Sequence, residues 1–354
     1  MQNQDLSEWL HGRVIKALSD GLPLRIQGGG NKSFYGRHTT GDLLDISGHN
    51  GVISYEPSEL VVTARAGTPL SSVENMLAEN GQMLAFEPPH FGPNATFGGM
   101  VACGLSGSRR PFAGSVRDSV LGVKLINGKA EILSFGGQVM KNVAGFDLSR
   151  LMVGAMGTLG VLLEISLKVL PKPEAEETFC FEITSDDALT VMNSWSGQHW
   201  PLSAACYDGE RFYIRLSGSE AAIVGSHKKL GGEWLPKGDE FWASLREQTL
   251  PFFQDTQTLW RLSLPPAASL SALFGPCFID WSGALRWVKT DFPAKNLFDR
   301  ARELGGHASL FRSTCANGPI FQPLPEPLKS LHISLKQAFD PKRIFNPGRM
   351  YPEW

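Results

Sequence analysis

Residues 25–33 read RIQGGGNKS, a short segment that runs directly into three consecutive glycines. Glycine adopts positive φ without steric cost and leaves its N–H group uncovered, as a loop must if its backbone is to hold a phosphate or pyrophosphate. An isolated run of glycines is more often an ordinary turn. The loop therefore predicts a diphosphate ligand on the condition that other segments of the chain support it.

The composition is typical of a globular chain with room for two domains. Of 354 residues, 42% are hydrophobic and 19% are charged, and the formal net charge is −2. This balance gives no basic surface for nucleic acid or for an anionic membrane. Asp5, Glu8 and Arg13 occupy the region in which a signal peptide needs its apolar core, and no apolar stretch is long enough to cross a bilayer. We therefore expect a cytoplasmic protein.

The spacing of cysteines and histidines predicts neither a metal centre nor a disulfide framework. The five cysteines lie far apart without a CxxC pair, and the eight histidines show no HxH, HxxH or HxxxH spacing. Zinc sites and iron–sulfur clusters usually show such pairs. We expect buried thiols and no metal.

The character of the chain changes near residues 171–177, PKPEAEE. Before this point, residues 87–118 form a long Gly-, Pro- and Ser-rich segment of the kind that is usually functional, and Asn127-Gly128 predicts a hairpin between two strands. Beyond it lie eight of the nine tryptophans, together with strand-like runs that alternate with helical stretches. We place a domain boundary here and expect an α+β second domain on an antiparallel sheet.

Four segments in this order resemble the FAD-binding domain of the vanillyl-alcohol oxidase family, also called the PCMH-type fold. They are RIQGGGNKS (25–33), GPNATFGGMVACGLSG (92–107), AGSVRDSVLGVKLINGKAEILSFGG (113–137) and KNVAGFDLSRLMVGAMGTLGVLLEISLKVLP (141–171). Within that family they are most similar to the glycolate oxidase and D-lactate dehydrogenase branch, which carries GYDLxxLxxGSEGTLG and DPxxxxNPGK. Here these motifs read GFDLSRLMVGAMGTLG and DPKRIFNPGR.

The resemblance implies an α+β fold in three parts. A PCMH-type, two-subdomain FAD-binding domain would span residues 1–173. A smaller α+β cap domain would span residues 174–325. The C-terminal segment, residues 326–354, would return to pack on the FAD-binding domain.

The resemblance also implies which residues bind FAD. The pyrophosphate would lie on the glycine loop, Gly28, Gly29, Gly30, Asn31, Lys32 and Ser33. A second phosphate and ribityl loop would contain Pro93, Thr96, Gly98 and Gly99. The isoalloxazine edge would lie near Gly114 and Ser115, and the adenosine and ribityl side near Gly157, Gly160 and Val161. Lys141, Asn142 and, in the tail, Asn346 complete the set.

Two departures from the family pattern concern the cofactor. Relatives with covalent flavin commonly carry a His just after the glycine loop, where this chain has Asn31, so we expect non-covalent FAD. Where many relatives have Ser-Glu, this chain has Ala155-Met156, so a carboxylate hydrogen bond to the cofactor is missing and FAD affinity would be lower.

A third departure concerns catalysis. Oxidation of a 2-hydroxy acid needs a base for the hydroxyl proton and cations for the carboxylate. Catalytic relatives carry an HGDGNxH-like metal and substrate signature in the cap, and this sequence has none. The nearest candidates are His307 as the base, with Arg312 and Arg286 as carboxylate clamps.

The resemblance implies an FAD-binding chain of a multi-subunit 2-hydroxy-acid dehydrogenase that oxidises glycolate to glyoxylate and passes electrons to an acceptor such as quinone. The chain would act with a larger catalytic flavoprotein subunit and an iron–sulfur subunit. Through these partners, the otherwise cytoplasmic chain could associate with the inner face of the membrane. Two alternatives remain. The first alternative is a self-sufficient FAD-dependent dehydrogenase, and the second is a flavoprotein scaffold that does not cycle.

Overall fold

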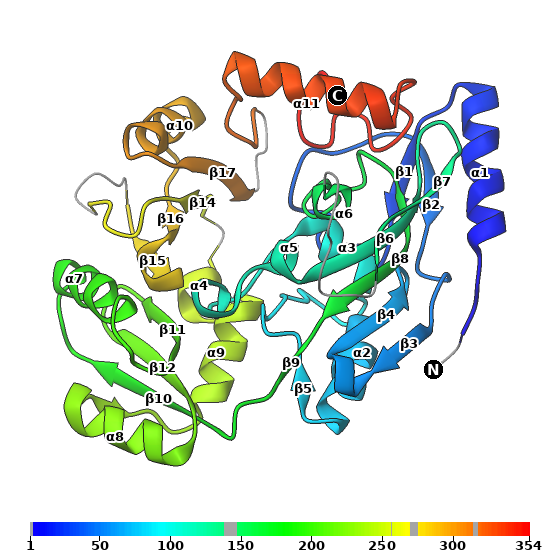
Figure 1. The fold of residues 1–354 in the computed structure, drawn as a ribbon. Coiled ribbons are helices and arrows are strands. Elements are labelled where there is room, and N and C mark those ends of the chain that lie inside the picture. The colour runs from blue at the N-terminus through cyan, green and yellow to red at the C-terminus, as the bar shows by residue number, and fades with distance from the viewer. Residues whose placement is uncertain (1–2, 138–146, 256, 270–274, 314–317) are drawn as a thin grey trace. The chain divides into compact units, whose positions relative to one another are not determined.

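The computed structural model describes residues 3–137, 147–255, 257–269, 275–313 and 318–354, which divide between two units (Figure 1). The first unit contains residues 1–106, 114–172 and 324–354, and the second contains residues 107–113 and 173–323. The short segment 107–113 lies inside the loop that the sequence predicts, and nothing in its pattern indicates that it belongs with the second unit.

A five-stranded sheet forms the centre of the first unit. Its strands pair antiparallel in the order β3 (Val52–Glu56), β4 (Val61–Arg65), β8 (Val161–Lys168), β6 (Val120–Ile126) and β7 (Ile132–Gly136). The predicted hairpin is confirmed, because β6 and β7 pair on either side of Asn127-Gly128. Alternate residues of β8, from Val161 to Leu167, are fully buried in the core, as period-two alternation requires.

A second, two-stranded element leads into the glycine loop. Strand β1 (Leu24–Gln27) runs parallel to β2 (Asp42–Asp45) and ends immediately before Gly28. Helix α1 (Ser7–Asp20) buries Leu10, Val14 and Ala17 at helical spacing. The remaining elements of this unit are η1 (Pro57–Glu59), α2 (Leu70–Glu79), β5 (Gln82–Met83), α3 (Phe97–Cys103), α5 (Val116–Ser119), α6 (Leu148–Leu151), β9 (Leu170–Pro171) and α11 (Glu326–Phe339).

The C-terminal segment packs into the first unit, as the sequence predicts. After α11, Ile344 and Phe345 join the apolar core that contains Leu24. Leu24 N donates to the carbonyl of Ile344 at 2.7 Å, and Asn346 N donates to the carbonyl of Leu24 at 3.0 Å. The last residues of the chain therefore lie along β1, next to the glycine loop.

The second unit contains an eight-stranded antiparallel sheet with helices, which agrees with the predicted α+β class. The strand order is β13 (Glu233–Trp234), β10 (Ala175–Phe181), β12 (Phe212–Gly218), β11 (Leu202–Tyr207), β15 (Cys277–Asp280), β16 (Leu285–Lys289), β14 (Leu259–Ser263) and β17 (His307–Arg312). Its helices are α4 (Arg110–Ala113), α7 (Ser185–Ser196), α8 (Glu220–Leu230), α9 (Gly238–Glu247), η2 (Pro251–Phe253), η3 (Trp281–Gly283) and α10 (Ala294–Glu303). Within the described residues, no helix combines the length and hydropathy that a bilayer span needs.

We expect Leu163→Ala to destabilise the first unit by about 2–5 kcal/mol, because Leu163 is fully buried in the central strand and its loss leaves a cavity. Denaturant unfolding followed by circular dichroism measures the change. The matched control is Leu43→Ala on β2, where the side chain is 42% exposed and the change should stay within about 0.5 kcal/mol. Equal losses in the two variants would contradict the assignment of the core.

Candidate functional site

The glycine loop lies in direct contact with the loop that contains Asn94 and Thr96. A Cβ atom at Gly29 would lie 1.4 Å from the carbonyl oxygen of Asn94, and one at Gly28 would lie 2.3 Å from Thr96 Oγ1. Gly29 therefore cannot carry a side chain while this backbone contact exists, and a side chain at residue 28 would have to displace the Thr96 hydroxyl. The two loops that the sequence assigns to one cofactor touch each other through their backbones.

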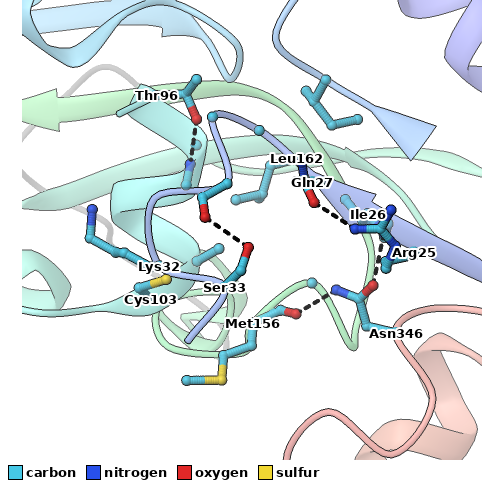
Figure 2. A pocket seen from close by; sticks show the side chains of 18 of the residues that line it. Arg25, Ile26, Gln27, Lys32, Ser33, Thr96, Cys103, Met156, Leu162 and Asn346 are labelled. Carbon is cyan, nitrogen blue, oxygen red and sulfur yellow. Dashed lines mark hydrogen bonds between the residues drawn. The ribbon is translucent and has the colours of Figure 1, made fainter. Parts of the chain in front are cut away.

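Hydrogen bonds from the end of the glycine loop hold the same two segments together. Asn31 Nδ2 and Lys32 Nζ both donate to the carbonyl of His90, each at 3.3 Å. Ser33 Oγ donates to the carbonyl of Gly30 at 2.7 Å, which closes the turn (Figure 2). The loop shape is thus fixed by contacts within the protein.

Thr96 caps the helix that follows the second loop. Its Oγ1 accepts from Gly99 N at 3.2 Å, and α3 begins at the next residue, Phe97. Gly98 packs against Ala66, where an added Cβ would lie 2.6 Å from the Ala66 Cβ. This close packing places the start of α3 beside the glycine loop.

The C-terminal tail forms a third wall. Asn346 Nδ2 donates to the carbonyl of Met156 at 2.7 Å, and Asn346 Oδ1 accepts from Ile26 N at 2.8 Å (Figure 2). One amide side chain therefore joins β1 to the loop of residues 156–160, the GTLG loop. Arg349 donates to the carbonyls of Arg37, Lys32, Ser33 and Tyr35. Burial lowers the pKa of its guanidinium, which these carbonyls solvate in place of water.

These three walls enclose a cavity with an empty volume of about 1100 Å³, including space open to solvent. The sequence-predicted residues that line it are Gly28, Gly29, Gly30, Asn31, Lys32, Ser33, Thr96, Gly98, Gly99, Gly157, Gly160 and Asn346.

Four other predicted cofactor residues, Pro93, Gly114, Ser115 and Val161, are not part of this lining. The side chain of Val161, the first residue of β8, is fully buried in the core. Successive side chains of a strand alternate between its two faces, and it is the next residue, Leu162, that lines the cavity, together with Gly160. Ser115 N and Oγ both donate to Asp118 Oδ2 at 2.8 Å, beside Gly114. Pro93 is exposed. Lys141 and Asn142 lie outside the described residues.

Several cavity residues were not predicted. Arg349 is the basic residue that ends DPKRIFNPGR, so the motif contained a signal for it. Met156 lines the cavity at the position where many relatives have Glu. The departure from the family pattern therefore changes a residue of the cavity wall. Arg25, Gln27, His38, Thr39 and Cys103 also line it without any sequence signal.

The cavity fits an anionic dinucleotide. Arg25, Lys32 and Arg349 line it, and no Asp or Glu stands among its described lining residues. The N–H groups of the three loop glycines find no acceptor within the described part of the chain. Such uncommitted backbone donors beside cationic side chains form a nest for phosphate oxygens.

Among the described residues that line the cavity, Cys103 is the only one with a thiol group. Burial raises its pKa, an effect that the nearby charges of Lys32 and Arg349 only oppose. The thiol is therefore protonated and weakly nucleophilic at neutral pH.

The three candidate catalytic residues all lie in the second unit, where the sheet register separates them. Leu262 of β14 faces Arg286 on one side and Ala308 on the other, whereas the next residue, Ser263, faces His307. Adjacent rows of a sheet point to opposite faces, so Arg286 and His307 point away from each other. His307 and Arg312 begin and end β17, about 16 Å apart along the strand.

Their individual surroundings differ as well. Arg286 is fully buried and donates to the carbonyls of Gly283, Pro266 and Ala268, and burial lowers its pKa to about 10. These contacts favour a structural role for Arg286. Arg312 Nη2 donates to Gln248 Oε1 at 2.9 Å.

His307 has the electrostatics of a base. Desolvation first, then the charges of Arg261 and Arg110, lower the pKa of its ring below 6.5, so the imidazole is neutral at pH 7. No group of three or more His, Cys, Asp or Glu side chains in the described ranges could hold a metal ion.

Comparisons with known proteins bear on the fold and on the cofactor. Residues 13–136 match the family described as FAD binding domain. The chain is 50% identical over 349 residues to glycolate oxidase subunit GlcE of Escherichia coli (strain K12), covering 99% of this chain and 98% of that protein. It is 32% identical over 142 residues to glycolate oxidase subunit GlcD of Bacillus subtilis (strain 168), covering 40% of this chain and 30% of that protein.

A solved structure of alkyldihydroxyacetonephosphate synthase shares the fold. The TM-score is 0.68 at 16% identity, over 96% of this chain and 75% of that chain. At this identity the likeness concerns the fold alone. With the family match, it confirms the predicted α+β FAD-binding fold. The family match and the similarity to GlcE confirm the predicted FAD cofactor.

We expect Gly29→Ala to abolish FAD binding, because the added methyl group would collide with the Asn94 carbonyl and push the two loops apart. Gly29→Asp should do the same and add a negative charge against the pyrophosphate. Quenching of flavin fluorescence on titration with apoprotein measures the affinity. Gly12→Ala, on α1 with nothing within 4 Å of the added atom, is the control and should bind normally. Normal binding by Gly29→Asp would contradict the assignment of this loop.

Proposed function

Since the chain belongs to the family of the glycolate oxidase subunit GlcE, we propose that it is the FAD-binding subunit of a multi-subunit glycolate oxidase. The complex oxidises glycolate to glyoxylate and passes the electrons to an acceptor such as quinone. The observation that carries this proposal is the cationic, glycine-lined cavity. It lies in a chain that is 50% identical to GlcE over 99% of its length.

The residues of the cavity have distinct tasks in this proposal. The N–H groups of Gly28, Gly29 and Gly30 donate to the pyrophosphate, whose charge Lys32 and Arg349 offset. Asn346 holds the GTLG loop against β1 and so keeps the cavity closed on that side. Bound FAD supplies the two-electron acceptor that oxidation of an alcohol to a carbonyl requires.

Attachment of the cofactor is non-covalent in this proposal. Asn31 stands at the position of the His that links flavin in covalent relatives, and an amide side chain is not a nucleophile. Its Nδ2 already donates to the His90 carbonyl. The protonated thiol of Cys103 offers no alternative point of attachment.

We infer that substrate oxidation depends on a larger catalytic flavoprotein subunit, with an iron–sulfur subunit as the electron carrier. Removal of a hydride and a hydroxyl proton from glycolate needs a base and a carboxylate clamp within reach of one small molecule. The register of the second unit supports this division of labour, because it separates His307 from Arg312 and Arg286.

A second candidate function, a self-sufficient 2-hydroxy-acid dehydrogenase, is favoured by one observation. His307 is neutral at pH 7, and the charges of Arg261 and Arg110 act on it, which is the combination of a base with cations for a carboxylate. A flavoprotein scaffold that does not cycle is the weakest alternative, because a domain kept only for its shape has no need of a cationic, glycine-lined cavity.

We expect the purified chain to show an oxidised flavin spectrum that stays oxidised when glycolate is added without oxygen. Addition of the catalytic and iron–sulfur subunits should then bleach the band. Visible absorption follows both steps, and dithionite provides the fully reduced reference. A sample that takes up no FAD would contradict the proposed function.

Bleaching by the isolated chain would instead establish the self-sufficient dehydrogenase. The rate of bleaching would then fall as the pH drops through the lowered pKa of His307, below 6.5, because the ring must be neutral to accept a proton. His307→Gln would remove this acid limb together with most of the rate, whereas His199→Gln, on another part of the second unit, would leave both unchanged.

A further inference from the structure

Helix α11 carries a buried ammonium group close to its C-terminal end. Lys336 is 2% exposed, and its Nζ donates to Asp340 Oδ2 at 2.6 Å, to the carbonyl of Thr158 at 2.7 Å and to the carbonyl of Phe345 at 3.1 Å. An ammonium has three donors, and each one here has an acceptor. Burial nonetheless lowers the pKa of Lys336, while Asp340 opposes this shift.

Asp340, which is completely buried, extends these contacts into the tail. Its Oδ1 accepts from Ile344 N at 3.0 Å, and its Oδ2 accepts from Phe345 N at 2.9 Å. The carboxylate thus folds residues 340–345 into a fixed turn. Gly128 packs against the same carboxylate, so the turn also rests on the β6–β7 hairpin.

The turn delivers Asn346 to the cavity. Asn346 directly follows Phe345, adopts a positive φ of 40°, and joins Ile26 of β1 to Met156 of the GTLG loop (Figure 2). Lys336 contacts the same GTLG loop, because its Nζ donates to the carbonyl of Thr158. The tail and the GTLG loop, which both contribute lining residues to the cavity, therefore share one buried ion pair.

We propose that Lys336 and Asp340 are positioning residues that hold these two walls in register and thereby set the affinity for FAD. The inference rests on the proposed FAD-binding function and adds two residues that do not touch the cavity themselves. It also explains the spacing of DPKRIFNPGR, since the Asp that begins the motif orients the Asn six residues later.

An ion pair suits this task because it specifies geometry. Burying two charges gains little stability over an apolar pair, but removing one partner leaves the other charge unpaired and costs much more. The directed hydrogen bonds to Thr158 and Phe345 fix distances that an apolar contact would leave adjustable.

The test compares Lys336→Met, Asn346→Ala and the double variant. Dissociation constants for FAD are measured by flavin fluorescence quenching, well below the melting temperature of each apoprotein. We expect each single variant to weaken binding about tenfold or more, and the double variant to lose far less than the product of the two losses. The control is Lys329→Met on the same helix, where the ammonium makes a surface pair with Glu353 at 3.5 Å and affinity should not change.

The outcomes separate this inference from the proposed function. If Lys336→Met lowers only the melting temperature and keeps wild-type affinity, the ion pair is merely structural and the inference is wrong. If Lys336→Met fails to fold, Asp340→Asn and Asn346→Ala decide, and wild-type affinity in both overturns the inference. A wild-type chain that binds no FAD refutes the proposed function instead.

Discussion

The contact between the glycine loop and the Asn94–Thr96 loop is the constraint on which the rest of the site depends. Because a Cβ at Gly29 would lie 1.4 Å from the Asn94 carbonyl oxygen, the two backbones can meet only if residue 29 is glycine. The N–H groups of Gly28, Gly29 and Gly30, which line the cavity, find no acceptor among the described residues. The glycines thus serve first to bring two protein segments together, and through this to expose donors for a phosphate.

The tail completes what the loops begin. Asn346 and Arg349 satisfy backbone carbonyls and an N–H group on β1, on the GTLG loop and on residues 32–37, so segments far apart in sequence become one wall. The turn that leads into Asn346 is held by the buried pair Lys336–Asp340. The cavity is therefore built from both ends of the chain, and its positive charge comes from both as well.

Sequence patterns predicted those parts of the molecule whose physics is local. The glycine loop, the Asn127-Gly128 hairpin and the returning tail depend on turn chemistry or on a short motif, and the structure contains each of them. Cavity residues such as Cys103, Thr39 and Arg25 face the site only because distant strands and loops converge, and a single sequence does not encode that convergence visibly. The same limit explains the candidate base and clamps, because one-residue offsets in strand register put His307 and Arg286 on opposite faces.

Calorimetric titration of the wild-type apoprotein with FAD, and in parallel with FMN, tests the central claim most directly. A pyrophosphate cradle formed by two touching loops predicts one FAD site per chain, removable by acid precipitation, and much weaker binding of FMN, which lacks the adenylate half. Equal affinity for FMN and FAD, or no heat of binding with either, would contradict the assignment of the loops to the pyrophosphate.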